Sequence, residues 1–410
     1  MRDVLVIGGG PAGATAAALL AARGLAVTVV EREPFPRFHV GESLLPCAEP
    51  VLRALGVPMD GFLPKQGAEF LDEATGGACA FRFAEALDGG PWAAPLAWQV
   101  ERASFDRLLL DRAEQAGAEV RAGVAVRDAE LAADAVTLTL ADETRLAARY
   151  LIDASGQAAY LARRHRCLVP YRGFGRAAAF CHVRELSPAA RARLEATGNI
   201  KVLLIPDGWA WLIPLGQGVL SVGFVKARGR VSAETLEEGF AASPLLRELT
   251  AGCPRGPTHL VGDFSYVNHR PSGPRFACLG DAACFLDPVF SSGVSLALVG
   301  VAAAVELLAP ALTEGREAAP DLLEPLEQRM EHAYRTFAAF IDRFYATRLV
   351  QNVFFAERAD PAVRRGVVSL LAGDVWRTDN AFQQSLLAAA AGGRRRLEWP
   401  PRPAGERPLA

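Results

Sequence analysis

The first thirty residues change their hydrophobic pattern three times. Residues 3–7 form a short apolar run, a glycine cluster follows, and residues 12–23 are rich in alanine and end before Gly24. The apolar run predicts a buried strand, and the alanine-rich stretch predicts a helix that Gly24 ends. Residues 25–30 are again apolar and predict a second strand. This order of strand, helix and strand predicts a βαβ unit in a parallel sheet.

The rest of the chain divides into a sheet-like part and a helical part. Over residues 66–100 and 174–266, apolar and polar positions alternate between glycine-rich turns, which predicts an antiparallel sheet. From residue 318 to about residue 390, apolar side chains recur at helical spacing, as at Leu326, Met330 and Phe337. The tail after Gly392 carries three consecutive arginines and four prolines and is predicted to be disordered.

Composition narrows the possible partners. A net charge of −2 and a pI near 6.4 argue against a nucleic-acid partner, which would need a basic field. The chain has no run of about eighteen uninterrupted apolar residues, so no integral membrane segment is expected. The seven cysteines lack a Cys-x-x-Cys pair and the six histidines lack ligand spacing, so we expect neither a metal site nor a disulfide framework. Unpaired cysteines are typical of a reducing cytoplasm, which is the predicted location.

The glycine cluster fits the Gly-x-Gly-x-x-Gly pattern of dinucleotide-binding folds, in the required place between a strand and a helix. Gly8 permits a tight turn, Gly10 lets a pyrophosphate approach the backbone, and Gly13 lets the helix pack closely on the strand. Glu31, at the end of the second strand, stands where a carboxylate accepts hydrogen bonds from a ribose, which favours FAD or NAD over NADP. Free N–H groups at the helix start would face the phosphates. The cofactor contacts predicted from this unit are Gly8, Gly10, Pro11, Ala12, Gly13, Glu31 and Arg32.

Two later segments favour FAD among the dinucleotides. Residues 151–156 predict a strand that leads into a turn at Asp153. Residues 278–283 predict another strand, which ends at Gly280 and Asp281 just before a long apolar helix. Rossmann-fold FAD proteins commonly use such a late Gly-Asp pair, in which the Asp binds the ribityl chain. Asp153, Gly280 and Asp281 are therefore added to the predicted cofactor contacts.

Four further motifs carry a family resemblance. They are Phe-Pro-Arg-Phe-His-Val-Gly-Glu-Ser at residues 35–43, Gln-Val-Glu-Arg-Ala-Ser-Phe-Asp at 99–106, Trp-x-Trp-x-Ile-Pro at 209–214, and Phe-x-x-Pro-x-x-Ser-x-Gly at 285–293. By these motifs and their order, roughly residues 1–380 resemble the FAD-dependent monooxygenases of the hydroxybenzoate-hydroxylase fold, and within them the flavin-dependent halogenase branch. The resemblance implies further FAD contacts at Gly41, Glu42, Ser43, Arg102, Val126, Pro288, Gly293 and Val294.

The fold class expected from pattern and resemblance together is α/β with an α+β insert. A discontinuous, Rossmann-type FAD-binding lobe would comprise residues 1–62, 99–170 and 267–312. A β-sheet lobe on the substrate side would comprise residues 63–98 and 171–266. A C-terminal helical region would span 313–392, followed by a disordered tail at 393–410.

The resemblance also implies an oxygen-using reaction. FAD with O2 as co-substrate would form a flavin C4a-hydroperoxide, and the N–H groups at the helix start after Pro288 would stabilise anionic reduced flavin. Trp209 and Trp211 alternate along a strand, so both should face the same side. No second nucleotide motif is visible, so electrons would come from NAD(P)H directly or through a separate flavin reductase. The candidate catalytic residues are Lys65, Trp209, Trp211, Ser292 and Gly293.

The sequence leaves two main outcomes open after the peroxide. In a halogenase, Lys65 would carry or orient the hypohalous acid, but Glu69, Asp72 and Glu73 are expected to hold this lysine in ion pairs. Phe290 stands where tryptophan-acting halogenases carry a glutamate, which excludes only the free-tryptophan subtype. The main expectation is therefore hydroxylation of an electron-rich aromatic ring, a phenol, indole or pyrrole, either free or carried on a peptide or carrier protein. The alternatives are halogenation of such a ring with Lys65, a geranylgeranyl-reductase-like flavin reductase, and a non-enzymatic FAD-binding scaffold.

Overall fold

The predicted βαβ unit lies at the centre of a parallel sheet. A computed structural model describes residues 1–171, 174, 176–226, 229–262, 264–357 and 360–392. In it β1 (Arg2–Ile7) pairs in parallel with β2 (Val27–Glu31) and β10 (Arg145–Asp153), and β10 pairs in parallel with β19 (Phe276–Cys278). The sheet continues through β7 (Glu119–Ala122), β8 (Val126–Leu131), β9 (Val136–Leu140) and β18 (Ser272–Gly273). The carboxyl ends of β1, β2 and β10 meet at one edge, where open α/β sheets bind ligands.

Three helices enclose one face of this sheet. α1 (Pro11–Ala21) is buried almost all round, because it packs against both α3 (Arg102–Gln115) and α8 (Ser292–Glu314). Small alanine side chains allow this close packing, and Pro11 suits the first helical position because its missing N–H would have no partner there. Within the described ranges α8 alone has the length and hydropathy of a membrane span, and 61% of its apolar window is buried inside the protein.

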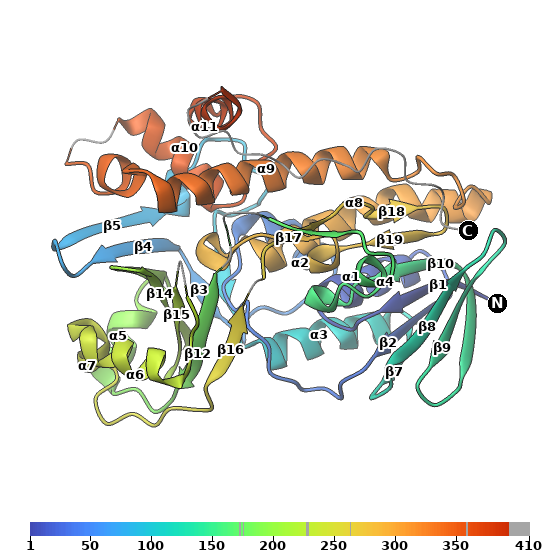
Figure 1. Cartoon of the computed structure of the whole chain (residues 1–410), viewed down its shortest axis with the longest axis horizontal. Helices are drawn as coiled ribbons and strands as arrows, with labels where there is room; N and C mark the ends of the chain where they lie inside the picture. The colour runs from blue at the N-terminus through green and yellow to red at the C-terminus, as the bar shows by residue number, and fades with distance from the viewer. Residues whose placement is uncertain (172–173, 175, 227–228, 263, 358–359, 393–410) are drawn as a thin grey trace.

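The second large sheet has seven strands in the order β16-β12-β15-β14-β13-β4-β5. Most pairs are antiparallel, as expected, but β13 and β4 pair in parallel. A pattern of alternation predicts a strand but not its neighbour, so this pairing was not foreseen. The helices α5, α6 and α7 lie at the same end of the molecule (Figure 1). The bounds are β4 (Gly67–Asp72), β5 (Gly77–Arg82), β12 (Ala177–Val183), β13 (Ile200–Ile205), β14 (Gly208–Gly216), β15 (Val219–Lys226), β16 (His259–Gly262), α5 (Pro188–Glu195), α6 (Ala233–Ala242) and α7 (Pro244–Leu249).

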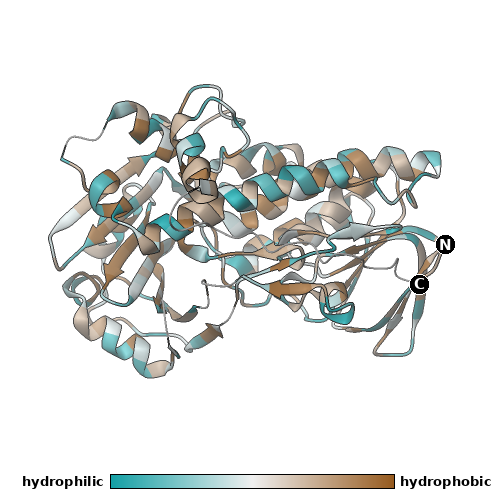
Figure 2. Cartoon of the chain, turned by 45° about the horizontal axis from the view of Figure 1, so that its top comes forward, coloured by the Kyte–Doolittle hydropathy of each residue, from teal (hydrophilic) through white to brown (hydrophobic). Residues whose placement is uncertain are grey.

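The predicted C-terminal helical region is confirmed. It contains α9 (Glu324–Ala346), the π-helical turn η6 (Val350–Phe354), α10 (Pro361–Leu371) and α11 (Ala381–Gly392). Figure 1 shows α9 running beside α8 and reaching over the second sheet, and Figure 2 shows hydrophilic bands recurring along α9 between apolar ones. Its apolar side is aromatic, with Phe340 stacked on Phe290 at 4.1 Å between ring centroids. The tail predicted to be disordered, residues 393–410, lies outside the described residues.

Short elements complete the chain and connect the two large sheets. They are α2 (Glu49–Ala54), α4 (Tyr160–Arg164), β3 (Leu63–Lys65), β6 (Ala97–Gln99), β11 (Leu168–Pro170), β17 (Tyr266–Asn268), β20 (Cys284–Phe285), η1 (Pro46–Ala48), η2 (Phe83–Glu85), η3 (Gly156–Ala158), η4 (Gly280–Ala282) and η5 (Pro288–Phe290).

Candidate active site

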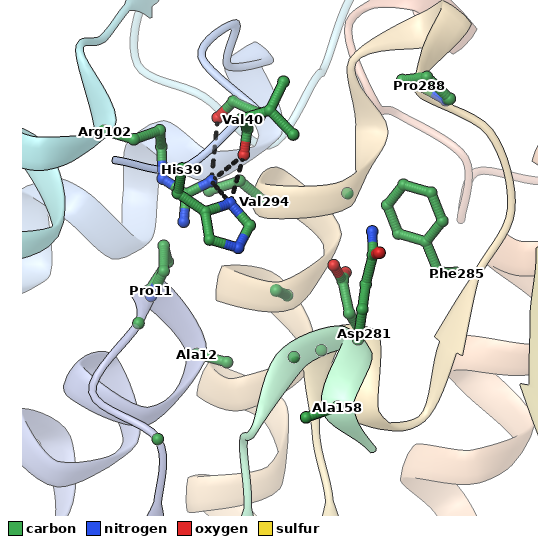
Figure 3. A pocket seen from close by; sticks show the side chains of 18 of the residues that line it. Pro11, Ala12, His39, Val40, Arg102, Ala158, Asp281, Phe285, Pro288 and Val294 are labelled. Atoms are coloured by element: carbon green, nitrogen blue, oxygen red, sulfur yellow. Dashed lines mark hydrogen bonds between the residues drawn. The ribbon is translucent and has the colours of Figure 1, made fainter. Parts of the chain in front are cut away.

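A cavity of about 620 Å³ opens at the carboxyl edge of the parallel sheet and extends to the second sheet. The glycine loop forms one wall, and η4 and the loop before α8 form another. Figure 3 shows Pro11 and Ala12 at the start of α1, with Arg102 and His39 on one side of the cavity and Asp281 and Phe285 on the other. Segments almost 300 residues apart in sequence therefore share one site.

The glycine loop has the geometry that its sequence predicts. Gly8 has a φ of +100°, and a Cβ there would lie 2.4 Å from the carbonyl oxygen of Ala154. A Cβ on Gly13 would lie 1.9 Å from the carbonyl oxygen of Gly8, so only glycine lets the helix approach this turn. Gly13 does not line the cavity and acts through packing alone.

Glu31 lines the cavity and also holds the glycine loop in place. One of its carboxylate oxygens accepts a hydrogen bond from the N–H of Gly9 at 2.7 Å, and the other accepts one from the N–H of Glu33 at 2.9 Å. Asp153 has a comparable structural task. It accepts hydrogen bonds from the N–H groups of Ser155 and Leu161, at 3.0 and 2.7 Å, and does not line the cavity. Asp153 thus shapes the turn behind the cavity wall, and its contact with the cofactor stays a prediction.

Arg102 is buried and fastens residues 35–43 beside the cavity. Its guanidinium donates to both carboxylate oxygens of Asp106, at 2.6 and 2.9 Å, and to the carbonyl oxygen of Val40 at 2.5 Å. The protein atoms packed around one side of the His39 ring and the neighbouring guanidinium lower the pKa of His39 to about 4, so this imidazole is neutral near pH 7. A Cβ on Gly41 would lie 2.9 Å from the Arg102 guanidinium, which explains why a glycine stands here.

Glu42 makes a contact that the sequence did not reveal. Its carboxylate lies 2.7 Å from Nε2 of His182 on β12, and the two residues are only 2% and 6% exposed. This pair joins residues 35–43 to the second sheet. No sequence signal points to it, because His182 stands in a strand of apolar residues with no motif around it.

Asp281 faces the cavity with a carboxylate that has no hydrogen-bond donor among the described residues. Burial raises its pKa to about 6, against the opposing effect of the Arg102 charge. A half-buried carboxylate of this kind is stabilised by a ligand whose hydroxyl groups donate hydrogen bonds to it. The ribityl chain of FAD carries such groups, so the cavity fits the cofactor predicted from the sequence.

The motif before α8 also lines the cavity, at Pro288, Ser292, Gly293 and Val294. α8 begins at Ser292. Its first N–H groups therefore belong to residues of the cavity wall, where they can stabilise negative charge on a ligand.

Trp209 and Trp211 both line the cavity, with ring centroids 5.9 Å apart, as their alternation predicted. Each indole N–H is already used. Trp209 donates to the hydroxyl of Tyr345 at 2.5 Å, and Trp211 donates to the hydroxyl of Ser221 at 3.1 Å. Both residues therefore offer aromatic surface to the cavity, rather than hydrogen-bond donors.

Lys65 lies directly behind the cavity wall and is 1% exposed. Its amine donates hydrogen bonds to the hydroxyl of Ser43 and the carbonyl oxygen of Leu44, both at 2.9 Å. Burial lowers its pKa to about 7, so the neutral amine is a major species at neutral pH.

The expected ion pairs of Lys65 are absent from the described residues, and this prediction is wrong. Glu69 pairs with Lys201 on the neighbouring strand β13. Asp72 accepts hydrogen bonds within its own turn, and Glu73 accepts one from the N–H of Leu245 at 2.8 Å. Because β4 and the turn after it direct these carboxylates away, closeness in sequence did not bring them to the lysine.

Of the predicted site residues, the structure brings nineteen to one cavity and leaves Gly13, Lys65 and Asp153 just behind its walls. The residues in the wall are Gly8, Gly10, Pro11, Ala12, Glu31, Arg32, Gly41, Glu42, Ser43, Arg102, Val126, Trp209, Trp211, Gly280, Asp281, Pro288, Ser292, Gly293 and Val294.

Comparison with known proteins identifies the family. Residues 3–87 and 74–362 match the model of the family described as Tryptophan halogenase. The chain belongs to this family. It is thus an FAD-dependent oxidoreductase of the halogenase branch, and the non-enzymatic alternative is set aside.

Individual halogenases match over different shares of their length. The Tryptophan 2-halogenase of Chondromyces crocatus is 34% identical over 316 residues, which are 72% of this chain and 58% of that relative. The 1H-pyrrole-2-carbonyl-[peptidyl-carrier protein] chlorinase of Pseudomonas fluorescens is 30% identical over 406 residues, 91% of this chain and 89% of that enzyme. The solved structure of the myxobacterial chondrochloren halogenase CndH, a variant of FAD-dependent halogenases, has a TM-score of 0.75 and 29% identity. The alignment covers 97% of this chain and 99% of that one. The chain spans less than two thirds of the length of the first of these relatives.

Proposed function

We propose that this protein halogenates an electron-rich aromatic or pyrrole ring, with Lys65 bringing the halogen to the ring. The observation that carries the proposal is the environment of Lys65: a buried amine beside the cavity of about 620 Å³, with hydrogen bonds to two neutral acceptors. The expectation of hydroxylation depended in part on carboxylates pairing with this lysine, and those carboxylates have other partners. Family membership points the same way.

Different residues of the cavity would bind different parts of FAD. The helix start at Pro11 and Ala12 would receive the pyrophosphate, Glu31 the ribose and Asp281 the ribityl chain. The start of α8 would face the pyrimidine end of the flavin ring. When bound and reduced, FAD activates dioxygen for the two-electron oxidation of a halide ion to hypohalous acid.

Lys65 suits the transfer because both of its protonation states are accessible near pH 7. A neutral amine can act as a nucleophile toward an electrophilic halogen, and an ammonium can hydrogen-bond to the acid that carries it. A charged partner would have held the lysine as ammonium and raised its pKa.

For the substrate, we infer a phenol or pyrrole ring rather than free tryptophan. Phe290 takes the position at which tryptophan-acting relatives carry a glutamate, and its ring is stacked on Phe340 in the core. One relative is named for a pyrrole held on a peptidyl carrier protein, so we include carrier-bound rings as substrates. We further propose that electrons come from NAD(P)H, through a separate reductase or directly, and that the protein works in the cytoplasm.

The test is incubation of FAD-loaded protein with a flavin reductase, NADH, oxygen and chloride or bromide, with free and carrier-bound phenols, indoles and pyrroles. Mass spectrometry separates added halogen from added oxygen. Lys65→Ala and the more space-filling Lys65→Met should lower ring halogenation at least about 100-fold, while Lys226→Ala serves as the matched control. Oxygen insertion by the unaltered protein, or halogenation that survives both Lys65 variants, would refute the proposal.

A further inference from the structure

Ser43 connects the buried lysine to the flavin cavity. Its hydroxyl accepts a hydrogen bond from the Lys65 amine at 2.9 Å, and Ser43 itself lines the cavity, whereas Lys65 does not. Among the described residues, Ser43 is the one polar side chain that touches the amine. Ser43 therefore links the cavity wall to the amine of Lys65.

The backbone around Ser43 is fixed on both sides. Ser43 forms a β-bridge with Gln99, and the N–H of Leu44 donates to the carbonyl oxygen of Trp98 at 2.9 Å. Lys65 pairs with Ala97 on the same strand, β6. The backbones of Ser43 and Lys65 are thus both paired with residues 97–99. This pairing fixes the distance between the two backbones, and so restricts the distance between the hydroxyl and the amine.

The two acceptors of the amine differ in what they can do. The carbonyl oxygen of Leu44 can only accept a hydrogen bond, so it serves any N–H of the lysine. The hydroxyl of Ser43 can accept from the ammonium and can also donate to the lone pair of the neutral amine. Ser43 is therefore the partner that can satisfy Lys65 in both protonation states without a change of position.

We propose that Ser43 is a positioning residue for Lys65, which holds the amine against the cavity wall and sets the pH range over which the lysine takes part in halogenation. This inference rests on the proposed function. The other titratable group coupled to the amine is Cys47 on η1, whose pKa burial raises to about 12, so it stays neutral. The nearest carboxylate of the same segment, Glu42, faces His182 instead.

Lysine-specific NMR tests the position of the amine without relying on activity. The chain has only three lysines, Lys65, Lys201 and Lys226, so 13Cε labelling gives three signals that single substitutions assign. The hydrogen bond of Ser43 to the charged ammonium is stronger than its hydrogen bond to the neutral amine, so Ser43→Ala should lower the pKa of Lys65 by about one unit. Ser43→Thr keeps a hydroxyl and should restore the wild-type value. Equal titration of Lys65 in the wild type and Ser43→Ala would overturn the proposal.

The same variants test the consequence for chemistry. The measured quantity is the amount of halogenated ring divided by the amount of hypohalous acid that a diffusible trap captures. Both amounts are normalised to bound FAD. Ser43→Ala should lower this ratio about tenfold at neutral pH and shift its pH optimum downward, with recovery in Ser43→Thr. If Ser43→Ala does not fold, Ser43→Cys can replace it in the same comparison, because the thiol is similar in volume to the hydroxyl and is a weaker hydrogen-bond acceptor. A shifted Lys65 signal in a protein that halogenates no ring would refute the proposed function while sustaining the positioning role.

Discussion

At the residue scale, the cavity contains a half-buried carboxylate whose charged form destabilises the fold until a ligand donates hydrogen bonds to it. Asp281 is the clearest case, because burial raises its pKa from 3.8 to about 6. The folded FAD-free protein thus binds this proton more readily than the unfolded chain. The contribution of Asp281 to stability must therefore become less favourable as pH rises from about 4 to about 6, by at most about 3 kcal/mol.

Asp281→Asn should remove that pH dependence. We expect the FAD-free variant to be more stable than the wild type at about pH 7.5, by up to about 3 kcal/mol, and close to it at about pH 4. Urea unfolding at the two pH values measures this difference, and FAD titration should show weaker binding. A wild-type advantage at the higher pH would mean that Asp281 stabilises the empty fold.

At the element scale, Trp211 depends on the strand beside it. Trp211 on β14 lies opposite Gly223 on β15, and a Cβ on Gly223 would lie 2.2 Å from the indole ring. The glycine thus leaves room for the ring to lie across β15. Its φ is not in the left-handed region, so this demand comes from the neighbouring strand and not from the local backbone.

Gly223→Ala should therefore displace Trp211 and destabilise the fold by about 1–3 kcal/mol through overpacking. Chemical unfolding gives the stability, and tryptophan fluorescence reports the ring. Gly61→Ala is the control, because no heavy atom would lie within 4 Å of its Cβ, and it should change stability by less than about 0.5 kcal/mol. Equal effects of the two substitutions would show that Trp211 does not need this space.

At the scale of the whole molecule, buried polar pairs join the flavin-binding elements to the second sheet. Glu42 and His182 form one such pair, and Arg176 and Asp287 form another at 3.1 Å. All four side chains are less than 7% exposed. Removing His182 leaves the Glu42 carboxylate without its hydrogen-bond partner and away from water, whereas Asp287 without Arg176 still accepts hydrogen bonds from the N–H of Val289 and the hydroxyl of Tyr345.

A double-mutant cycle on Glu42 and His182 tests this connection. His182→Ala should cost about 1–3 kcal/mol of unfolding free energy and weaken FAD binding, because the Glu42 carboxylate is left unpaired. Removing both side chains should cost less than the sum of the single changes. The exposed pair of Arg184 and Glu101, at 3.3 Å, is the control and should contribute less than about 1 kcal/mol. Strict additivity at Glu42 and His182 would contradict coupling between them.

The sequence by itself determined the features that depend on neighbours along the chain. The βαβ unit, the glycines of the first turn and the shared side of the two tryptophans follow from local periodicity and from backbone sterics, and the family motifs placed FAD among them. The tertiary structure decided the partners of charged groups. Glu69 could not be assigned to Lys201 rather than Lys65, nor Glu42 to His182, because each pair is brought together from positions more than a hundred residues apart in the sequence. The chemistry of Lys65 follows from these partners. A lysine buried beside neutral acceptors has a lowered pKa and a reactive neutral amine, whereas a lysine beside carboxylates stays charged.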